Sequence, residues 1–253
     1  MSEMQVQTPG EATPGLSQMD RVTNTFIAPS KTFEDIKRGN RSWWLPFVLM
    51  VIVSYIFFAA VYTKIGMQTV SENQIRMDPK AEERMSQVPP DQREMQMKIS
   101  VYITEGIFAA SPLFVLAAGA VIALVLMGTI NFAFGGKATF GSVFAVWMFA
   151  SLPTIVKTLL GIVVIYAGAA PETFNIRNFA PTNVAAFLNP LETNKALYTF
   201  AGWLDIVTIW YMVLMGIGLA AVAGVKRNSG YIAVFAWWVI LMLVGVGFAA
   251  VTG

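Results

Sequence analysis

The fold is decided by the stretch IFAASPLFVLAAGAVIALVLMGTINF, residues 107–132, which contains no charged side chain. A helix rises ~1.5 Å per residue, and the hydrocarbon core of a bilayer is ~30 Å thick, so about 20 apolar residues cross it. This stretch exceeds that length. It therefore predicts a helix that spans a membrane.

Four more apolar stretches of similar length lie on either side of it. They cover about residues 44–62, 141–167, 200–223 and 231–251. The five stretches together predict an all-α, polytopic membrane protein with five transmembrane helices within residues 43–253. Ser151-Leu152-Pro153 interrupts the third stretch, so the alternative is that this stretch re-enters the membrane and returns to the same side.

The composition supports a membrane protein and excludes several functions. Hydrophobic residues make up 56% of the chain and charged residues 13%, against about 25% charged residues in soluble domains. A formal net charge of +2, with scattered Lys and Arg, argues against nucleic acid as a partner. Cysteine and histidine are absent, which removes disulfides, Cys/His zinc sites and the usual general base. We expect no enzyme activity, no metal and no cofactor.

The N-terminal region divides into two parts ahead of the first span. Residues 1–18 show no apolar periodicity and predict a disordered tail. Residues 19–42 place apolar side chains such as Phe26 and Phe33 beside basic ones such as Lys37 and Arg41. This pattern is typical of an amphipathic segment in the lipid headgroup layer, and the alternative is a solvated linker. We identify no secretory signal, and we expect the first span to be retained.

One large polar segment, residues 64–104, lies between the first two spans. Asp78-Pro79 and Pro89-Pro90 are typical of helix starts. We expect both spans to continue beyond the membrane as helices joined by a short helix, which together form a helical extramembrane cap. Its basic and acidic residues nearly cancel, as on a solvated surface, and the alternative is an interaction surface.

Basic residues in the loops indicate the orientation of the chain. The N-terminal side carries most of them in its short segments, whereas the third loop on the opposite side carries only Arg177 and Lys195. Cytoplasmic loops are enriched in Lys and Arg. The long first loop weakens this asymmetry, but we expect the N-terminus in the cytoplasm and the C-terminus outside, in a bacterial cytoplasmic membrane.

Two ionisable residues, Lys157 and Asp205, fall inside the apolar stretches. Each charge costs about 2.5–3.5 kcal/mol at the centre of a membrane helix, so each needs a partner. Antiparallel neighbours would bring both into the outer half of the bilayer. We favour a neutralising, structural ion pair, and the alternative is a proton- or ion-coupling pair in a transport path.

Small and aromatic residues indicate packing and depth in the bilayer. Gly216, Ala220 and Gly224 recur every four residues and predict a smooth stripe where another helix approaches closely. Tryptophans are enriched at membrane interfaces, so we interpret three of them as anchors: Trp43, Trp44 and Trp203.

Several stretches together resemble the bacterial branch of the Yip family, whose eukaryotic members bind Rab-type GTPases. They are TFIAPSKTFEDIK (residues 25–37), SWWLPF (42–47), FAFGGKATFGSVFAVWMFASLP (132–153) and LNPLETNKALYTFAGWLDIVTIWYMVLMGIGLAAV (188–222). The resemblance implies five spans and a cytoplasmic N-terminus. The aspartate-leucine-tyrosine-glycine-proline motif of the eukaryotic branch is absent, so Rab binding is not carried over.

The sequence thus predicts a non-catalytic membrane scaffold or accessory subunit that acts through helix packing. Its expected partners are the lipid bilayer and other membrane proteins, with a transport complex or a second copy of the chain as candidates. The alternative is a small transport-related subunit that uses the Lys157 and Asp205 pair. A role in envelope stress or lipid homeostasis would look the same in the sequence.

Overall fold

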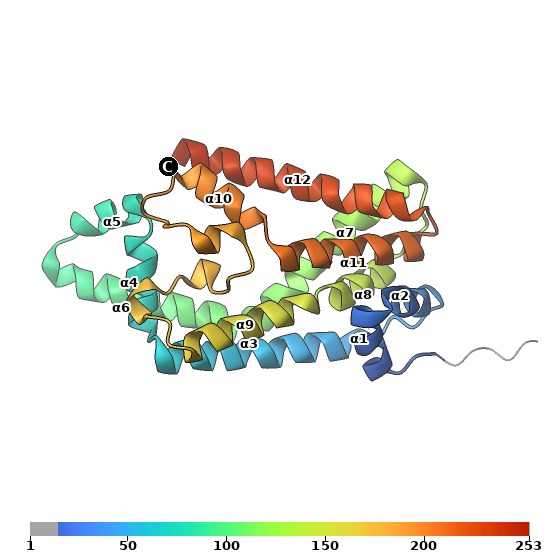
Figure 1. Ribbon diagram of the computed structural model, residues 1–253, viewed down its shortest axis with the longest axis horizontal. Helices are drawn as coiled ribbons and strands as arrows, with labels where there is room; N and C mark the ends of the chain where they lie inside the picture. The colour runs from blue at the N-terminus through green and yellow to red at the C-terminus, as the bar shows by residue number, and fades with distance from the viewer. Residues whose placement is uncertain (1–14, 253) are drawn as a thin grey trace, which may run out of the picture.

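Five helical segments are long and apolar enough to cross a membrane, as the sequence predicts. The computed structural model describes residues 15–252, in which helices account for the regular structure and no strand occurs. The five segments are α3 (Trp44–Lys64), α7 (Ser111–Phe134), α8 with α9 (Phe140–Ala150 and Pro153–Tyr166), α11 (Ile206–Ala223) and α12 (Arg227–Thr252). They lie side by side along the long axis of the molecule (Figure 1). The all-α polytopic fold is confirmed.

Helix α8 forms the centre of the bundle. All of its residues from Ser142 to Ala150 are buried, and it packs against α7 and α11. Trp147 of α8 lies against Gly119 of α7 so closely that a side chain at Gly119 would overlap the indole ring. The apolar side chains of α8 are therefore used in packing against other helices of the bundle.

The third span is interrupted but does not turn back. Helix α8 ends at Ala150 and α9 begins at Pro153, which has no N–H to donate to the preceding turn. The two helices follow one another in the same direction (Figure 1), and α9 then packs along α3. The structure thus has a broken span rather than the alternative of a re-entrant one.

The polar segment after α3 is helical, and two of its helices begin at the predicted Asp78-Pro79 and Pro89-Pro90 starts, but the two spans beside it end and begin elsewhere than expected. It forms α4 (Met67–Arg76), α5 (Pro79–Ser86) and α6 (Pro90–Ala109). The first span does not continue outward, because Gly66 adopts a φ of +85° and turns the chain after Lys64. The second span begins at Ser111 and not at 107, because α6 reaches Ala109 and the proline in the first turn of α7 separates the two helices.

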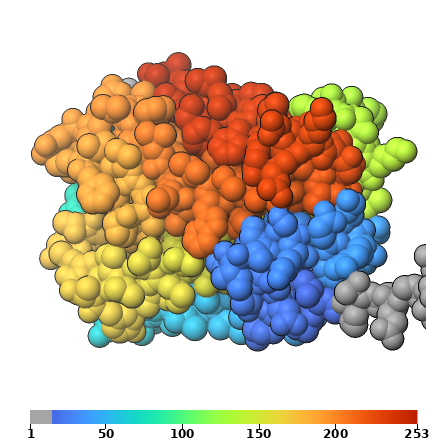
Figure 2. Space-filling model, turned by 45° about the vertical axis from the view of Figure 1, so that its right-hand side comes forward, coloured from blue at the N-terminus to red at the C-terminus, as the bar shows by residue number. Residues whose placement is uncertain are grey.

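The N-terminal helices dock onto the bundle. They are α1 (Gln18–Ile27) and α2 (Pro29–Lys37), which pack against α11, α8 and α3. Phe33 and Ile36 are fully buried, which contradicts a solvated linker. Figure 2 shows these N-terminal residues, in blue, directly against the orange and red C-terminal spans. They form a fixed layer at this end of the bundle.

The last residues of the predicted tail, 15–18, take part in the fold. Residues 1–14 lie outside the described part of the chain. Ser17 caps α1, since its hydroxyl accepts from the backbone of Asp20, and the N–H of Leu16 donates to Asp35 at 3.1 Å. These residues are ordered because the capping interaction at Ser17 and the contact of Leu16 with Asp35 hold them against α1 and α2.

The stretch 200–223 is two helices and not one. After the third span, the loop contains three short 3₁₀ turns, η1 (Pro171–Thr173), η2 (Ile176–Asn178) and η3 (Val184–Phe187), and leads into α10 (Lys195–Trp203). The chain breaks at Leu204 and Asp205 before α11 starts at Ile206. The loop, α10 and the cap occupy the end of the molecule opposite α1 and α2 (Figure 1).

Candidate functional site

The two ionisable residues found in the apolar stretches lie together in the structure. The ammonium Nζ of Lys157 is 2.6 Å from Oδ2 of Asp205. The Asp205 side chain is 3% exposed and that of Lys157 is 25% exposed. Removing either charge alone would leave the other without its counterion in a largely buried place.

Asp205 also holds the break between α10 and α11. It does not lie within a helix, as its place inside the apolar stretch 200–223 predicts, but is the N-cap of α11. Its Oδ1 accepts from the backbone N–H of Val207 at 2.8 Å and of Thr208 at 3.1 Å. A carboxylate suits this position, because the first N–H groups of a helix have no partner and the helix dipole favours negative charge there.

The sequence analysis missed the loop residues that complete this site. The Thr182 hydroxyl donates to Asp205 Oδ2 at 2.9 Å, and the N–H of Ile206 donates to the carbonyl of Thr182 at 3.0 Å. Asn183 forms an isolated β-bridge with Asp205. No sequence signal could have found these partners, since they come from a loop more than 20 residues away along the chain. Asp205 thus joins the loop, α9 and α11.

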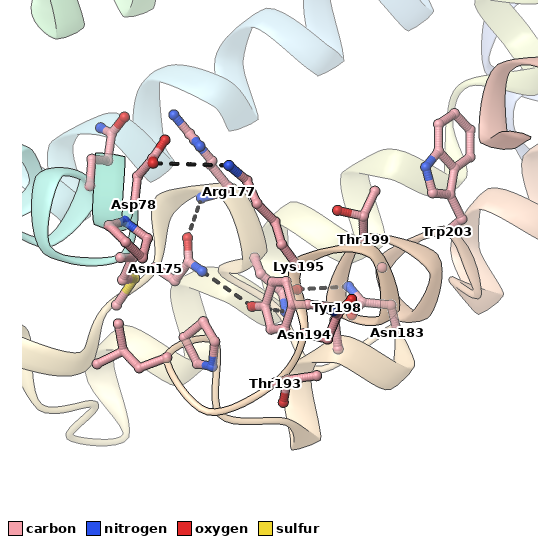
Figure 3. Close-up of a pocket in the computed structure, with 18 of the residues that line it drawn as sticks. Asp78, Asn175, Arg177, Asn183, Thr193, Asn194, Lys195, Tyr198, Thr199 and Trp203 are labelled. Carbon is pink, nitrogen blue, oxygen red and sulfur yellow. Dashed lines mark hydrogen bonds and ion pairs between the residues drawn. The ribbon is translucent and has the colours of Figure 1, made fainter. Parts of the chain in front are cut away.

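A polar pocket of about 680 Å³ opens beside the pair at this end of the molecule. It lies between the start of α5, the loop after α9, α10 and the end of α12. Figure 3 shows Asp78 of the cap facing Lys195 of α10, with Arg177 beside them. Lys157 reaches the lining from α9. The pocket therefore unites residues that are far apart in the sequence.

Asparagine amides order the pocket wall around a tyrosine. The amides of Asn175 and Asn178 donate to the Tyr198 hydroxyl oxygen at 3.3 and 3.4 Å. Asn183 in turn donates to Asn178 at 2.7 Å. Asn194 caps α10, because its side chain accepts from two backbone N–H groups. These contacts give an irregular loop a defined shape.

A second buried ion pair lies at the opposite end of the molecule, where sequence reasoning did not expect a site. Arg21 of α1 is fully buried, 3.5 Å from Asp35 of α2, and donates to the backbone carbonyls of Asn40 and Ser42. Its guanidinium lies 4.3 Å from the ring centroid of Phe149 in α8. Burial lowers the pKa of Arg21 to about 10 while Asp35 opposes this, so Arg21 is cationic at neutral pH. This pair fixes α1 and α2 to the bundle.

The residue types present limit the chemistry that this site can carry. The chain has no cysteine or histidine, and within residues 15–252 no three acidic side chains come close enough to hold a metal ion. Asp205 is engaged by four donors, so its oxygens are not available as a general base. Asp205 therefore acts here as a structural carboxylate that holds α9, the loop and α11 together.

A comparison with protein-family models matches the Yip1 domain to residues 23–249, which is most of the chain. The chain belongs to the Yip1 domain family. No curated protein and no solved structure matches it significantly. The match includes the Lys157 and Asp205 pair, most of the pocket lining and nearly all of the five apolar segments, whereas Arg21 lies just before its first residue.

The turn between α7 and α8 of this Yip1 domain explains its Gly-Gly-Lys sequence. Gly135 ends α7 with a φ of +67°, which favours glycine. Gly136 lies against Ala223 at the end of α11, and the N–H of Lys137 donates to the Ala223 carbonyl at 3.0 Å. Only residues that allow this close approach fit here, which accounts for the motif.

Two residues of the predicted small-residue stripe pack against α12, and the third is the C-cap of α11. Gly216 lies against Tyr231 of α12, and Ala220 lies against Gly230. Gly224 does not belong to the stripe, because it ends α11 with a φ of +71°. The physical reason is the C-cap, which needs a left-handed residue at that position.

The three predicted tryptophan anchors lie in different surroundings. Trp44 is exposed on α3. Trp43 is half-buried and packs edge-on against Phe144 of α8. Trp203 is half-buried against Trp238 of α12. Trp43 and Trp203 therefore also take part in packing inside the protein.

Proposed function

We propose that this Yip1-domain protein is a non-catalytic membrane scaffold or accessory subunit, which binds other membrane proteins or lipids by helix packing. Its membrane is the bacterial cytoplasmic membrane, with α1 and α2 on the cytoplasmic side and the cap outside. The basic residues around the N-terminal helices support this orientation. The family and the five apolar segments support an integral membrane protein.

An apolar stripe on α6 carries the proposal. Four large side chains spaced along one face of this cap helix are exposed: Met95 (63%), Ile99 (49%), Tyr102 (69%) and Ile103 (58%). They precede the span α7 by at least two turns of helix. Contiguous exposed apolar side chains outside a membrane span are typical of a surface that packs against a partner. The helix spacing fits a partner helix.

Site-specific photocrosslinking in native membranes tests this role. A photoreactive amino acid at Ile99 should give an adduct of one defined mass, because a packed partner holds one surface against the stripe. The matched control is the same probe at Glu83, which is exposed on α5 of the same cap. No adduct from Ile99, or the same adducts from both positions, contradicts a scaffold that acts through α6.

The alternative is a transport-related subunit, for which the one favourable observation is that Lys157 reaches the polar pocket. The contacts of Asp205 weigh against it. A proton or ion carrier must release its partner, whereas Asp205 is held by Lys157, by Thr182 and by the start of α11. We therefore assign the pair a structural role, as the means by which the bundle supports the loop and α10.

A further inference from the structure

The polar pocket carries more positive than negative charge. Four basic side chains line it from four segments, Lys80 of α5, Lys157 of α9, Arg177 of η2 and Lys195 of α10. In the described part of the chain, Asp78 is the one acidic residue in the lining, and Asp205 lies beneath Lys157. Four cations against two carboxylates leave an excess of two positive charges. Such a pocket attracts an anion.

Two of the four cations have no carboxylate to neutralise them. Lys157 pairs with Asp205, and Lys195 lies 4.0 Å from Asp78. Within residues 15–252, Lys80 and Arg177 form no ion pair, and both are exposed. The Arg177 side chain stands at the pocket beside Lys195 (Figure 3). A guanidinium and an ammonium that line one pocket without a carboxylate partner suit phosphate oxygens.

The Tyr198 hydroxyl adds a neutral donor to the same pocket. Its oxygen already accepts from Asn175 and Asn178. A phenol has one hydrogen to donate, and its oxygen is occupied here as an acceptor, so the hydrogen points away from the two amides. Tyr198 lines the pocket and donates to no atom within residues 15–252. It therefore prefers a ligand rich in acceptors.

The position of the pocket indicates a lipid as the source of the anion. It lies at the outer ends of the spans, next to the start of α11 and the last turn of α12. Leu191 lines the pocket and is exposed. Three more exposed apolar side chains lie on the same loop and on α10: Phe187, Leu197 and Phe200. A free anion gains nothing from these apolar groups, whereas the acyl chains of a lipid do.

We propose that this pocket binds the phosphate-bearing headgroup of an anionic membrane lipid. Arg177, Lys80 and the Tyr198 hydroxyl contact the phosphate, and the acyl chains lie over the apolar residues beside α10. The inference rests on the proposed binding role and names a lipid partner for it. Its test uses purified protein and needs no protein partner, so either proposal can fail alone.

The experiment measures lipid binding by the full-length protein in detergent. Native mass spectrometry and thermal unfolding are recorded with phosphatidylglycerol, with phosphatidylcholine and with inorganic phosphate alone. We expect one retained phosphatidylglycerol, and a higher unfolding midpoint with it than with phosphatidylcholine. Binding should weaken roughly tenfold or more in the variant Lys80→Gln/Arg177→Gln, since two charge-assisted contacts are lost.

Arg84→Gln is the matched control, since Arg84 is exposed on α5 and does not line the pocket. It should bind phosphatidylglycerol as the unchanged protein does. Equal binding of both lipids overturns the proposal, and so does an equal loss in the Arg84 control. Inorganic phosphate that raises the midpoint as much as phosphatidylglycerol also overturns it, because the site would then take a soluble anion. A folded double variant that binds normally has the same consequence.

Discussion

At the scale of single residues, Asp205 combines two structural tasks. It neutralises Lys157 and it caps α11 through two backbone N–H groups. The two tasks can be separated by substitution, because asparagine is as good an N-cap as aspartate but carries no charge. Leucine would remove both functions at once. A double change to apolar residues, which the sequence alone would suggest as a rescue, would therefore lose the cap.

A double-mutant cycle with Lys157→Met and Asp205→Asn measures the pair in isolation. Lys157→Met leaves a buried carboxylate without its counterion, and such changes cost about 3–5 kcal/mol, here near the lower limit because Lys157 is partly exposed. Asp205→Asn should cost less, since Lys157 can turn toward the pocket. The double variant should recover to within about 1 kcal/mol of the original protein.

Thermal or denaturant unfolding in detergent provides these free energies. Asp205→Leu in the Lys157→Met background is the control for the cap, and it should be less stable than the asparagine version by about 1 kcal/mol. A coupling energy below about 0.5 kcal/mol, the range found for independent sites, would mean that the pair does not stabilise the fold.

At the scale of helices, the contact between α11 and α12 depends on the close approach of their two backbones. A Cβ atom at Gly230 of α12 would overlap the carbonyl oxygen of Gly216 and crowd Ala220. Backbone atoms cannot rotate away as a side chain can, so the helices would have to separate. The pattern of small residues on α11 therefore has its counterpart in a glycine on α12.

Gly230→Ala should destabilise the protein by about 1–3 kcal/mol, the usual range for overpacking. Gly128→Ala is the control, because Gly128 lies within α7 and a side chain there would meet nothing within 4 Å. Alanine favours helix, so that change should be neutral or slightly stabilising. Unfolding midpoints of the two variants decide the matter. Equal midpoints would show that α11 and α12 are not in close contact.

The helices also show which features the sequence can predict. Length and apolar content fix the five spans, because hydrocarbon leaves a helix few alternatives. The starts of α5 and α6 follow from Asp78-Pro79 and Pro89-Pro90, which act locally. The breaks at Gly66 and at Leu204 are harder to predict from the sequence. Gly66 is one glycine among 20, and the break at Leu204 is held by a contact with Thr182 from a distant loop. Tertiary contacts determine where helices break at such positions.

The candidate sites divide in the same way. Lys157 and Asp205 stand out because a charge in an apolar stretch needs a partner. The pocket does not stand out, because its wall comes from the cap, a loop and α10, and none of these stretches is unusual alone. Arg21 and Asp35 are equally inconspicuous, since charged residues in a polar stretch are ordinary. Their burial is visible only once α1 and α2 are placed on α8 and α11.

At the scale of the whole molecule, the two ends differ in construction. One end is closed by α1 and α2, which the Arg21 and Asp35 pair joins, and by the glycine turn, which the N–H of Lys137 ties to α11. The other end carries the cap, the polar pocket and the exposed stripe on α6. Helices that cross the membrane along the long axis of the bundle (Figure 1) place these two ends on opposite sides of it, and an odd number of spans puts the C-terminus on the side of the cap. The proposed binding surfaces then all face the side opposite the N-terminal helices.

Cysteine labelling in intact cells tests this arrangement most directly, because the chain has no cysteine of its own. Single cysteines replace Gln87 at the end of α5 and Asn228 in the first turn of α12, both exposed. A membrane-impermeant maleimide should label the Gln87 position from outside, and the Asn228 position only after the membrane is permeabilised. Labelling of both from the same side would contradict the five-span fold, and the reverse pattern would contradict the proposed orientation.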